Sequence, residues 1–193
     1  AIGSDLDVAL PEYGDLLSPD FALVNPFAEE GSRWALLGNF APHGLDFDDL
    51  DQSAEWNATP QLRLERLLRE REVAIGLLVS EQAVRLVYAP RGESTGHITF
   101  PLAFMMEPAG RPVMAAFLAL LCDERLIGVG AEENLLALMQ KSREFQNEVS
   151  EKLAQQVLGA LHALVRGIQA ADERSGQTLL RAGLEEDPQH NYG

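Results

Sequence analysis

The segment 60–88 constrains the fold of this chain more than any other. Thr59 precedes a proline and then leucines at helical spacing between arginines and glutamates, a pattern typical of a capped amphipathic helix ending near Arg71. Two β-type runs follow, Val73–Val79 and Ala83–Tyr88, separated by a short polar turn. The first reads as buried on both faces, and the second alternates. A helix followed by apolar strands predicts an α/β fold.

Two shorter apolar runs, Phe21–Val24 and Trp34–Leu37, lie among many proline and glycine turn signals in the first 60 residues. Their lengths suit strands, with residues 25–32 as a hairpin connection. The order strand, strand, helix, strand predicts a single sheet carrying the helix on one face. We expect the helix to contact that sheet through Leu64, Leu67 and Leu68.

Beyond residue 97, Ile98–Leu102 predicts a short strand, and Val113–Cys122 and Ala131–Gln140 predict helices. Apolar residues then recur on one stripe of a long helix that begins near residue 145. The stripe consists of Phe145, Val149, Leu153, Val157, Leu161, Leu164, Val165 and Ile168. We expect it to pack against neighbouring helices, with a partner-binding face as the alternative. The expected domains are an α/β core over residues 1–110 and a helical subdomain over 111–193.

The net charge of −15 is unevenly distributed. Residues 1–60 hold twelve acids and one base, and residues 61–193 hold eighteen acids and fourteen bases. This composition argues against tight DNA binding by the chain itself, because a phosphate-binding surface needs clustered bases. No apolar stretch reaches the roughly 20 residues of a membrane span. With a single cysteine, Cys122, we expect a cytoplasmic protein, and the start without methionine indicates part of a longer one.

Two neighbouring segments resemble a known family: Glu65-Arg-Leu-Leu-Arg-Glu-Arg-Glu-Val-Ala-Ile-Gly-Leu-Leu-Val79 and Val84-Arg-Leu-Val-Tyr-Ala-Pro-Arg-Gly-Glu-Ser-Thr-Gly-His97. They are similar to the N-terminal part of type II restriction-modification enzymes and phage-defence adenine-specific DNA methyltransferases. Phe145-Gln-Asn-Glu-Val-Ser-Glu-Lys-Leu and Asp187-Pro-Gln-His-Asn-Tyr-Gly193 look like the same family. The resemblance implies a restriction-endonuclease-like mixed sheet core, then helices leading to a methyltransferase domain that binds S-adenosylmethionine.

We expect that methyltransferase domain to lie outside the chain. The sequence has neither Asn-Pro-Pro-Tyr nor Asp-Pro-Pro-Tyr, the tetrapeptides that hold a flipped adenine, and no glycine-rich cofactor loop after a strand. We therefore expect no methyl transfer and no cofactor in this chain.

A restriction-type nuclease site needs an aspartate at one strand end and an acid-x-lysine on the next strand, to hold Mg²⁺ and orient the attacking water. Asp20 supplies the first carboxylate, but the strand from Trp34 has neither acid nor lysine at the required positions. Glu65 in the following helix offers a displaced carboxylate. The alternatives are that Asp20 caps or terminates a strand and that Glu65 lies on a solvated helix face.

The polar loop 91–97 is a candidate for phosphate contact, since backbone amides beside glycines and nearby hydroxyls can hold a phosphate oxygen. The residues that would do this are Arg91, Gly92, Ser94, Thr95 and Gly96. Alternatively, Arg91 pairs with Glu93 and the glycines only shape the turn.

The acidic run Asp46–Asp51 lacks the central glycine and terminal glutamate of an EF-hand, so it predicts a solvated loop anchored by its two apolar members. The four histidines have no metal-ligand spacing. The sequence thus favours a non-catalytic nuclease-like domain of a restriction-modification or phage-defence methyltransferase, assisting DNA engagement or subunit assembly. An active Mg²⁺-dependent endonuclease using Asp20 and Glu65, and an acidic protein-interaction module, remain the alternatives.

Overall fold

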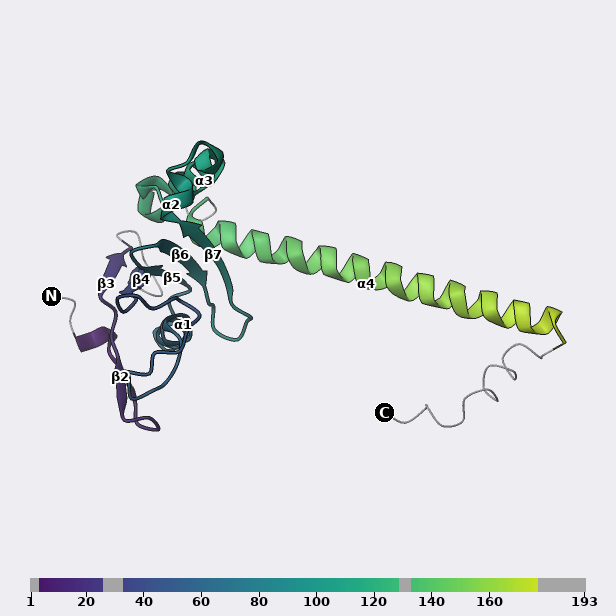
Figure 1. The fold of residues 1–193 in the computed structure, drawn as a ribbon, viewed down its shortest axis with the longest axis horizontal. Coiled ribbons are helices and arrows are strands. Elements are labelled where there is room, and N and C mark those ends of the chain that lie inside the picture. The colour runs from purple at the N-terminus through teal and green to yellow at the C-terminus, as the bar shows by residue number, and fades with distance from the viewer. Residues whose placement is uncertain (1–3, 26–32, 129–132, 177–193) are drawn as a thin grey trace. The chain divides into compact units, whose positions relative to one another are not determined.

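A computed structural model describes residues 4–25, 33–128 and 133–176 of the chain (Figure 1). The chain divides into two compact units, Ala1–Gln140 and Lys141–Gly193. The first unit contains the whole sheet, and the described part of the second is a single helix. The predicted hairpin connection lies largely outside the described residues, as does the segment 177–193.

The first unit is built on a five-stranded sheet whose strands are neighbours in chain order. The strands are β3 (Phe21–Val24), β4 (Trp34–Phe40), β5 (Ile75–Val79), β6 (Ala83–Tyr88) and β7 (Gly96–Pro101). The middle pair, β4 and β5, is parallel and the other pairs are antiparallel. Helix α1 (Pro60–Glu70) connects the parallel pair. The mixed α/β sheet and its four predicted strands are therefore confirmed.

Helix α1 begins where the sequence indicated. The Thr59 side chain accepts a hydrogen bond from the Leu62 amide, and Pro60 occupies the first turn, where its missing N–H costs nothing. The predicted contact leucines, Leu64, Leu67 and Leu68, are each almost fully buried. The expected packing of this helix on the sheet is confirmed.

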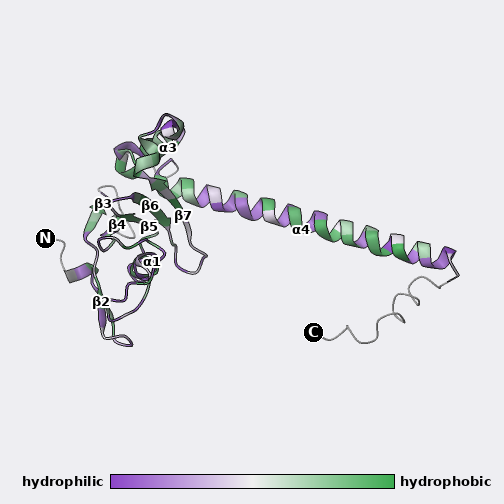
Figure 2. Ribbon diagram, in the orientation of Figure 1, coloured by the Kyte–Doolittle hydropathy of each residue, from purple (hydrophilic) through white to green (hydrophobic). Residues whose placement is uncertain are grey.

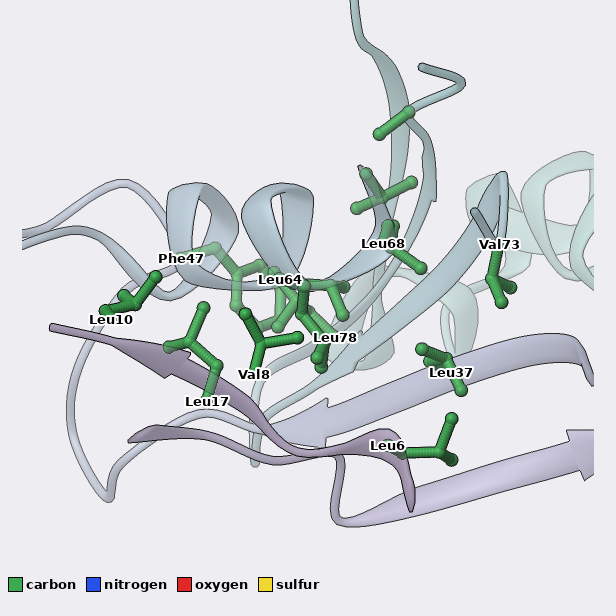
Figure 3. Close-up of a cluster of buried hydrophobic side chains, with 13 residues drawn as sticks. Leu6, Val8, Leu10, Leu17, Leu37, Phe47, Leu64, Leu68, Val73 and Leu78 are labelled. Carbon is green, nitrogen blue, oxygen red and sulfur yellow. The ribbon is translucent and has the colours of Figure 1, made fainter. Parts of the chain in front are cut away.

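One face of the sheet is covered by α1 and by a hairpin of two short strands, β1 (Val8–Leu10) and β2 (Asp15–Leu17), which follow the 3₁₀ turn η1 (Ser4–Leu6). Figure 3 shows side chains from these elements gathered with Leu64, Leu68 and Leu78 in one apolar cluster. The sequence did not predict the hairpin, because three-residue strands are too short to show a period.

Helix and sheet approach closely at Gly76, in the middle of β5. A Cβ built at Gly76 would lie 2.7 Å from Leu68 Cδ1 and 2.9 Å from Leu64 Cδ2. Those methyl groups belong to buried side chains that have little room to move. Because Gly76 has no side chain, α1 can pack closely against β5.

The opposite face of the sheet is covered by α2 (Leu102–Met105) and α3 (Arg111–Leu120), with a 3₁₀ turn η2 (Pro108–Gly110) between them and a π-helical turn (Glu124–Gly128) after them. Phe117 of α3 packs edge-on against Phe100 of β7. Because both faces are covered, β6 is buried at every position from Arg85 to Tyr88. The predicted alternation of burial along this strand is wrong.

Helix α4 (Leu135–Arg174) replaces the two helices that the sequence predicted after residue 130. The side chain of Asn134 accepts a hydrogen bond from the Ala137 amide at its start, and residues 131–132 lie outside the described part. Leu135 is buried in the core of the first unit. The helix then continues without interruption through the second unit.

The apolar stripe of α4 is not covered by the residues that the structure describes. All eight predicted stripe residues are exposed, with exposed fractions between 44% for Ile168 and 67% for Phe145. The expected packing of the stripe against neighbouring helices is therefore not found among the described residues. Figure 2 shows apolar residues becoming more frequent along the second half of the helix, and no charged residue lies between Lys152 and Arg166.

The stripe also turns around the helix. Each four-residue step advances about 40° beyond a full turn, so Phe145 lies about 120° around the axis from Val157. From Leu153 to Ile168 the mixed three- and four-residue steps keep the large apolar side chains on one face. The continuous apolar face therefore covers residues 153–168.

Candidate functional site

The most developed polar site lies around Arg85 of β6, whose side chain is hydrogen-bonded to Gln61 of α1. This side chain is only 7% exposed, and four hydrogen bonds hold its guanidinium. Its terminal nitrogens donate to the two Asp48 carboxylate oxygens at 2.6 and 2.8 Å, and one of them donates to Gln61 Oε1 at 2.5 Å. Nε donates to Thr99 Oγ1 at 2.8 Å, and the guanidinium carbon lies 5.0 Å from the centre of the Phe47 ring. The buried charge is thus paired and hydrogen-bonded.

Arg85 changes the electrostatics of its partner. Hydrogen bonds from its guanidinium hold the pKa of Asp48 below its usual value, although partial burial acts in the opposite direction. Electrostatic interactions with Arg85 and with His97 also lower it. Asp48 is therefore fixed as a carboxylate at neutral pH, which suits an ion-pair partner rather than a proton donor.

A chain of hydrogen bonds extends from this ion pair along α1. Gln61 Nε2 donates to Glu65 Oε1 at 2.9 Å and lies 3.1 Å from His97 Nδ1. Thr95 Oγ1 donates to Glu65 Oε2 at 2.9 Å and accepts from Arg69 at 2.8 Å. The helix is therefore tied to β6, to β7 and to the loop before β7 by polar side chains as well as by leucines.

A cavity of about 650 Å³ adjoins Arg85, beyond the carboxyl ends of β4 and β5. Arg85 and Thr99 line it, together with acidic side chains from the loop 41–49 and from the β5–β6 turn. His43 Nδ1 lies 2.6 Å from Glu81 Oε1 and links these two segments. The acids that line the cavity are Asp46, Asp49 and Glu81. Among the residues that the structure describes, no three His, Cys, Asp or Glu side chains are arranged to hold a metal ion.

The two nuclease candidates lie in separate hydrogen-bonded groups. Asp20 Oδ2 accepts from the Phe40 amide at 2.7 Å and from Asn39 Nδ2 at 3.2 Å, so it ties the start of β3 to the end of β4. Asp20 therefore caps the start of β3 and does not terminate a strand. Glu65 belongs to the Gln61 and Thr95 group on α1. Its side chain is 13% exposed, so its expected place on a solvated helix face is wrong.

The loop 91–97 uses several of its polar groups inside the chain. Arg91 pairs with Glu72 at 2.6 Å instead of with Glu93, and Thr95 is held between Glu65 and Arg69. Gly92 has a φ of +82°, a conformation that favours glycine. Gly96 pairs with Tyr88 at the start of β7, and Ser94 lies in the loop between these glycines. Phosphate contact by this loop stays a prediction.

Arg85 and Gln61 were not predicted as site residues from the sequence. The available signal was a charged residue inside an apolar strand, which needs a counter-ion if the strand is covered on both faces. The acidic run Asp46–Asp51 supplies that counter-ion through Asp48. Phe47 anchors the run as predicted, but Leu50, the other expected anchor, is exposed.

Comparison of the chain with protein-family models, with curated proteins and with solved structures finds no match. Within the described residues, no helix is both long and apolar enough to cross a membrane.

Proposed function

We propose that this chain is a non-catalytic, restriction-endonuclease-like domain of a DNA restriction-modification or phage-defence methyltransferase, and that its role is subunit assembly through α4. The exposed apolar face of α4 is the observation that carries the proposal. The family context rests on the resemblance of segments 65–79 and 84–97. The order β3, β4, α1, β5 in one mixed sheet supports the nuclease-like assignment of the core.

A helix with this composition needs a partner. Large apolar side chains gathered on one exposed helix face mark an interaction surface, because water does not favour a patch of that size. Residues 141–174 hold five acids and five bases, so their net charge is zero and they do not repel a protein partner. The acids are Glu144, Glu148, Glu151, Asp172 and Glu173, and the bases are Lys141, Arg143, Lys152, Arg166 and Arg174.

Assembly is better supported than DNA engagement, because many arginines of the first unit already have acidic partners. The pairs are Arg63–Asp15, Arg66–Glu70, Arg69–Glu65, Arg85–Asp48 and Arg91–Glu72. A surface that binds phosphates must release counter-ions through unneutralised Lys and Arg. Together with twelve acids in the first 60 residues, these pairs favour a protein partner over a nucleic acid.

Catalysis by Asp20 and Glu65 has no support from their positions. Each carboxylate accepts hydrogen bonds from its own local group, and no lysine lies on β4 to orient a water. We expect no nicking of supercoiled plasmid by residues 1–193 with Mg²⁺ or Mn²⁺. The Asp20→Asn variant should fold and behave identically. Nicking that is present in the wild type and lost in Asp20→Asn would revive the endonuclease alternative.

The assembly role is tested in the parent enzyme by sedimentation. Leu161→Glu with Leu164→Glu places two charges on the apolar face, and Gln155→Glu with Gln156→Glu places the same charges on the polar face. We expect the first pair to lower the assembly state of the enzyme and the second pair to leave it unchanged. An assembly state that is the same in all three proteins would refute the proposed function.

A further inference from the structure

We infer that the partner of α4 is α4 of a second copy of this chain, packed antiparallel across the face formed by residues 153–168. This inference rests on the proposed assembly function and identifies the partner. Three observations support it: the spacing of the apolar residues, the area they expose, and the distribution of charge between the two units.

The spacing is self-complementary. Six residues follow one another at intervals of three, four, three, four and three. Two packed helices have this spacing of apolar residues, and the series reads the same in both directions. The residues are Ala154, Val157, Leu161, Leu164, Ile168 and Ala171. Their sizes are symmetric too, with alanines outside, β-branched residues next and leucines at the centre. A two-fold axis between two such helices therefore gives each residue a partner of matching size.

In this register each apolar residue has a defined neighbour. Leu161 lies level with Leu164 of the second copy, and Val157 lies level with its Ile168. Leu158 flanks the seam beside Val165 of the second copy, so the apolar contact is wider than a single line of residues. Both flanking residues are more than half exposed in one chain. Pairing in this register removes both flanking side chains from water.

The exposed area matches a stable interface. Seven large apolar side chains between Leu153 and Ile168 are 44–59% exposed. At about 60–120 Å² of apolar area for each such side chain, they present roughly 400–800 Å². A standard protein interface buries about 800 Å² on each partner. A second α4 covers this area without any other element of the chain.

The charge distribution selects the antiparallel arrangement. Residues 1–140 hold 22 acids and nine bases, a net charge of −13, whereas residues 141–174 are neutral. A parallel pair would bring two such units together at the same end. In the antiparallel pair the two Lys141 residues are about 65 Å apart along the axis, well beyond the screening length of about 8 Å at physiological salt. Glu151 then lies near Asp172 of the second copy, so added salt should strengthen the pairing.

Sedimentation equilibrium of residues 1–193 tests the pairing. We expect a dimer at about 100 µM that dissociates on dilution, as mass action requires, and a dimer fraction that rises with salt. Leu161→Glu with Leu164→Glu should be monomeric at every concentration, and Gln155→Glu with Gln156→Glu should dimerise like the wild type. Circular dichroism of each variant shows whether α4 is still helical. A wild type that stays monomeric at 100 µM, or a control that also dissociates, would overturn the inference.

Cysteine pairing tests the orientation. In a Cys122→Ser background, chains carrying Val157→Cys are mixed with tagged chains carrying Ile168→Cys and then oxidised. The antiparallel register predicts disulfides between the two kinds of chain and none within either kind. Disulfides within each kind would show a parallel pair and contradict the arrangement.

The two proposals fail differently. If residues 1–193 are monomeric while the parent enzyme still loses subunits on Leu161→Glu with Leu164→Glu, the second copy is the wrong partner and the assembly role stands. If neither protein responds to these substitutions, both proposals fail.

Discussion

The two units of this chain differ in how their side chains find partners. In the first unit, leucines from α1 are buried against the sheet, and the buried Arg85 is paired with Asp48. In the second unit, the leucines between Leu153 and Leu164 of α4 are exposed. The core leucines of the first unit therefore have packing partners within the chain, whereas these leucines of α4 are exposed.

This difference separates a unit that is stabilised by its own contacts from a helix that needs a partner. The α/β unit contains both partners of its main contacts, so it has the features of an independently stable domain. A single helix cannot bury its own apolar face, and tertiary packing supplies most of the stability of helices in proteins. The stability of α4 should therefore depend on what binds it.

The largest expected effect separates two leucine truncations. Leu68→Ala removes a fully buried side chain from the first unit and should lower its free energy of unfolding by about 2–5 kcal/mol. Leu164→Ala truncates an exposed side chain of α4 and should change that quantity by less than about 0.5 kcal/mol. Urea unfolding followed by tryptophan fluorescence measures this, because Trp34 and Trp56 both lie in the first unit. If both variants lost the same free energy of unfolding, the proposed difference between the two units would be wrong.

Two glycine substitutions should have opposite effects. Gly76→Ala introduces a methyl group against Leu64 and Leu68 and should destabilise the first unit by about 1–3 kcal/mol. Gly159→Ala meets no described atom within 4 Å and replaces a poor helix former, so it should raise the helical content of α4. Urea unfolding measures the first effect and far-ultraviolet circular dichroism the second. A Gly76→Ala variant as stable as the wild type would mean that α1 packs less closely on β5 than the structure shows.

A smaller effect is expected at the Asp48–Arg85 pair. Asp48→Asn removes the carboxylate from a buried guanidinium and should cost about 1–2 kcal/mol at pH 7, a value discounted because the Asp48 side chain is 63% exposed. The exposed neighbour Asp49 provides the control, as Asp49→Asn should change little.

The same pair makes stability depend on pH. Because folding lowers the pKa of Asp48 below its usual 3.8, its contribution is complete above that value and is lost as the pH falls through the lower folded pKa. Urea unfolding of both proteins between pH 7 and pH 2 should show the wild type losing its advantage over Asp48→Asn in acid. A difference that stays constant over this range would rule out the ion pair as its source.

The sequence predicted the elements whose pattern is local. The strands from Phe21 to Tyr88 and helix α1 have apolar runs or leucine spacing long enough to show a period, and Thr59 marks where the helix begins. The three-residue strands of the β1–β2 hairpin carry no such signal. The merging of two predicted helices into α4 was also missed, since the boundary lay in the polar residues between two apolar runs.

The candidate site could be predicted only in part, because its contacts join residues far apart in the sequence. Asp48 and Arg85 are 37 positions apart, and Glu65 meets Thr95 across 30 positions. Neither contact can be inferred from the sequence before the arrangement of the strands and α1 is known. For α4 the sequence shows an apolar face, but the same pattern fits a buried helix and an exposed one, so what covers it does not follow from periodicity.

Hydrogen exchange of residues 1–193 over a range of chain concentrations shows whether protection of each unit depends on a second chain. Amides of the sheet and α1 should be protected to the same degree at every concentration, because their partners lie in the same chain. Amides of Leu153–Ile168 should exchange quickly in dilute solution and become protected as the concentration rises. Strong protection of this segment that does not depend on concentration, in a protein that sediments as a monomer, would contradict the account.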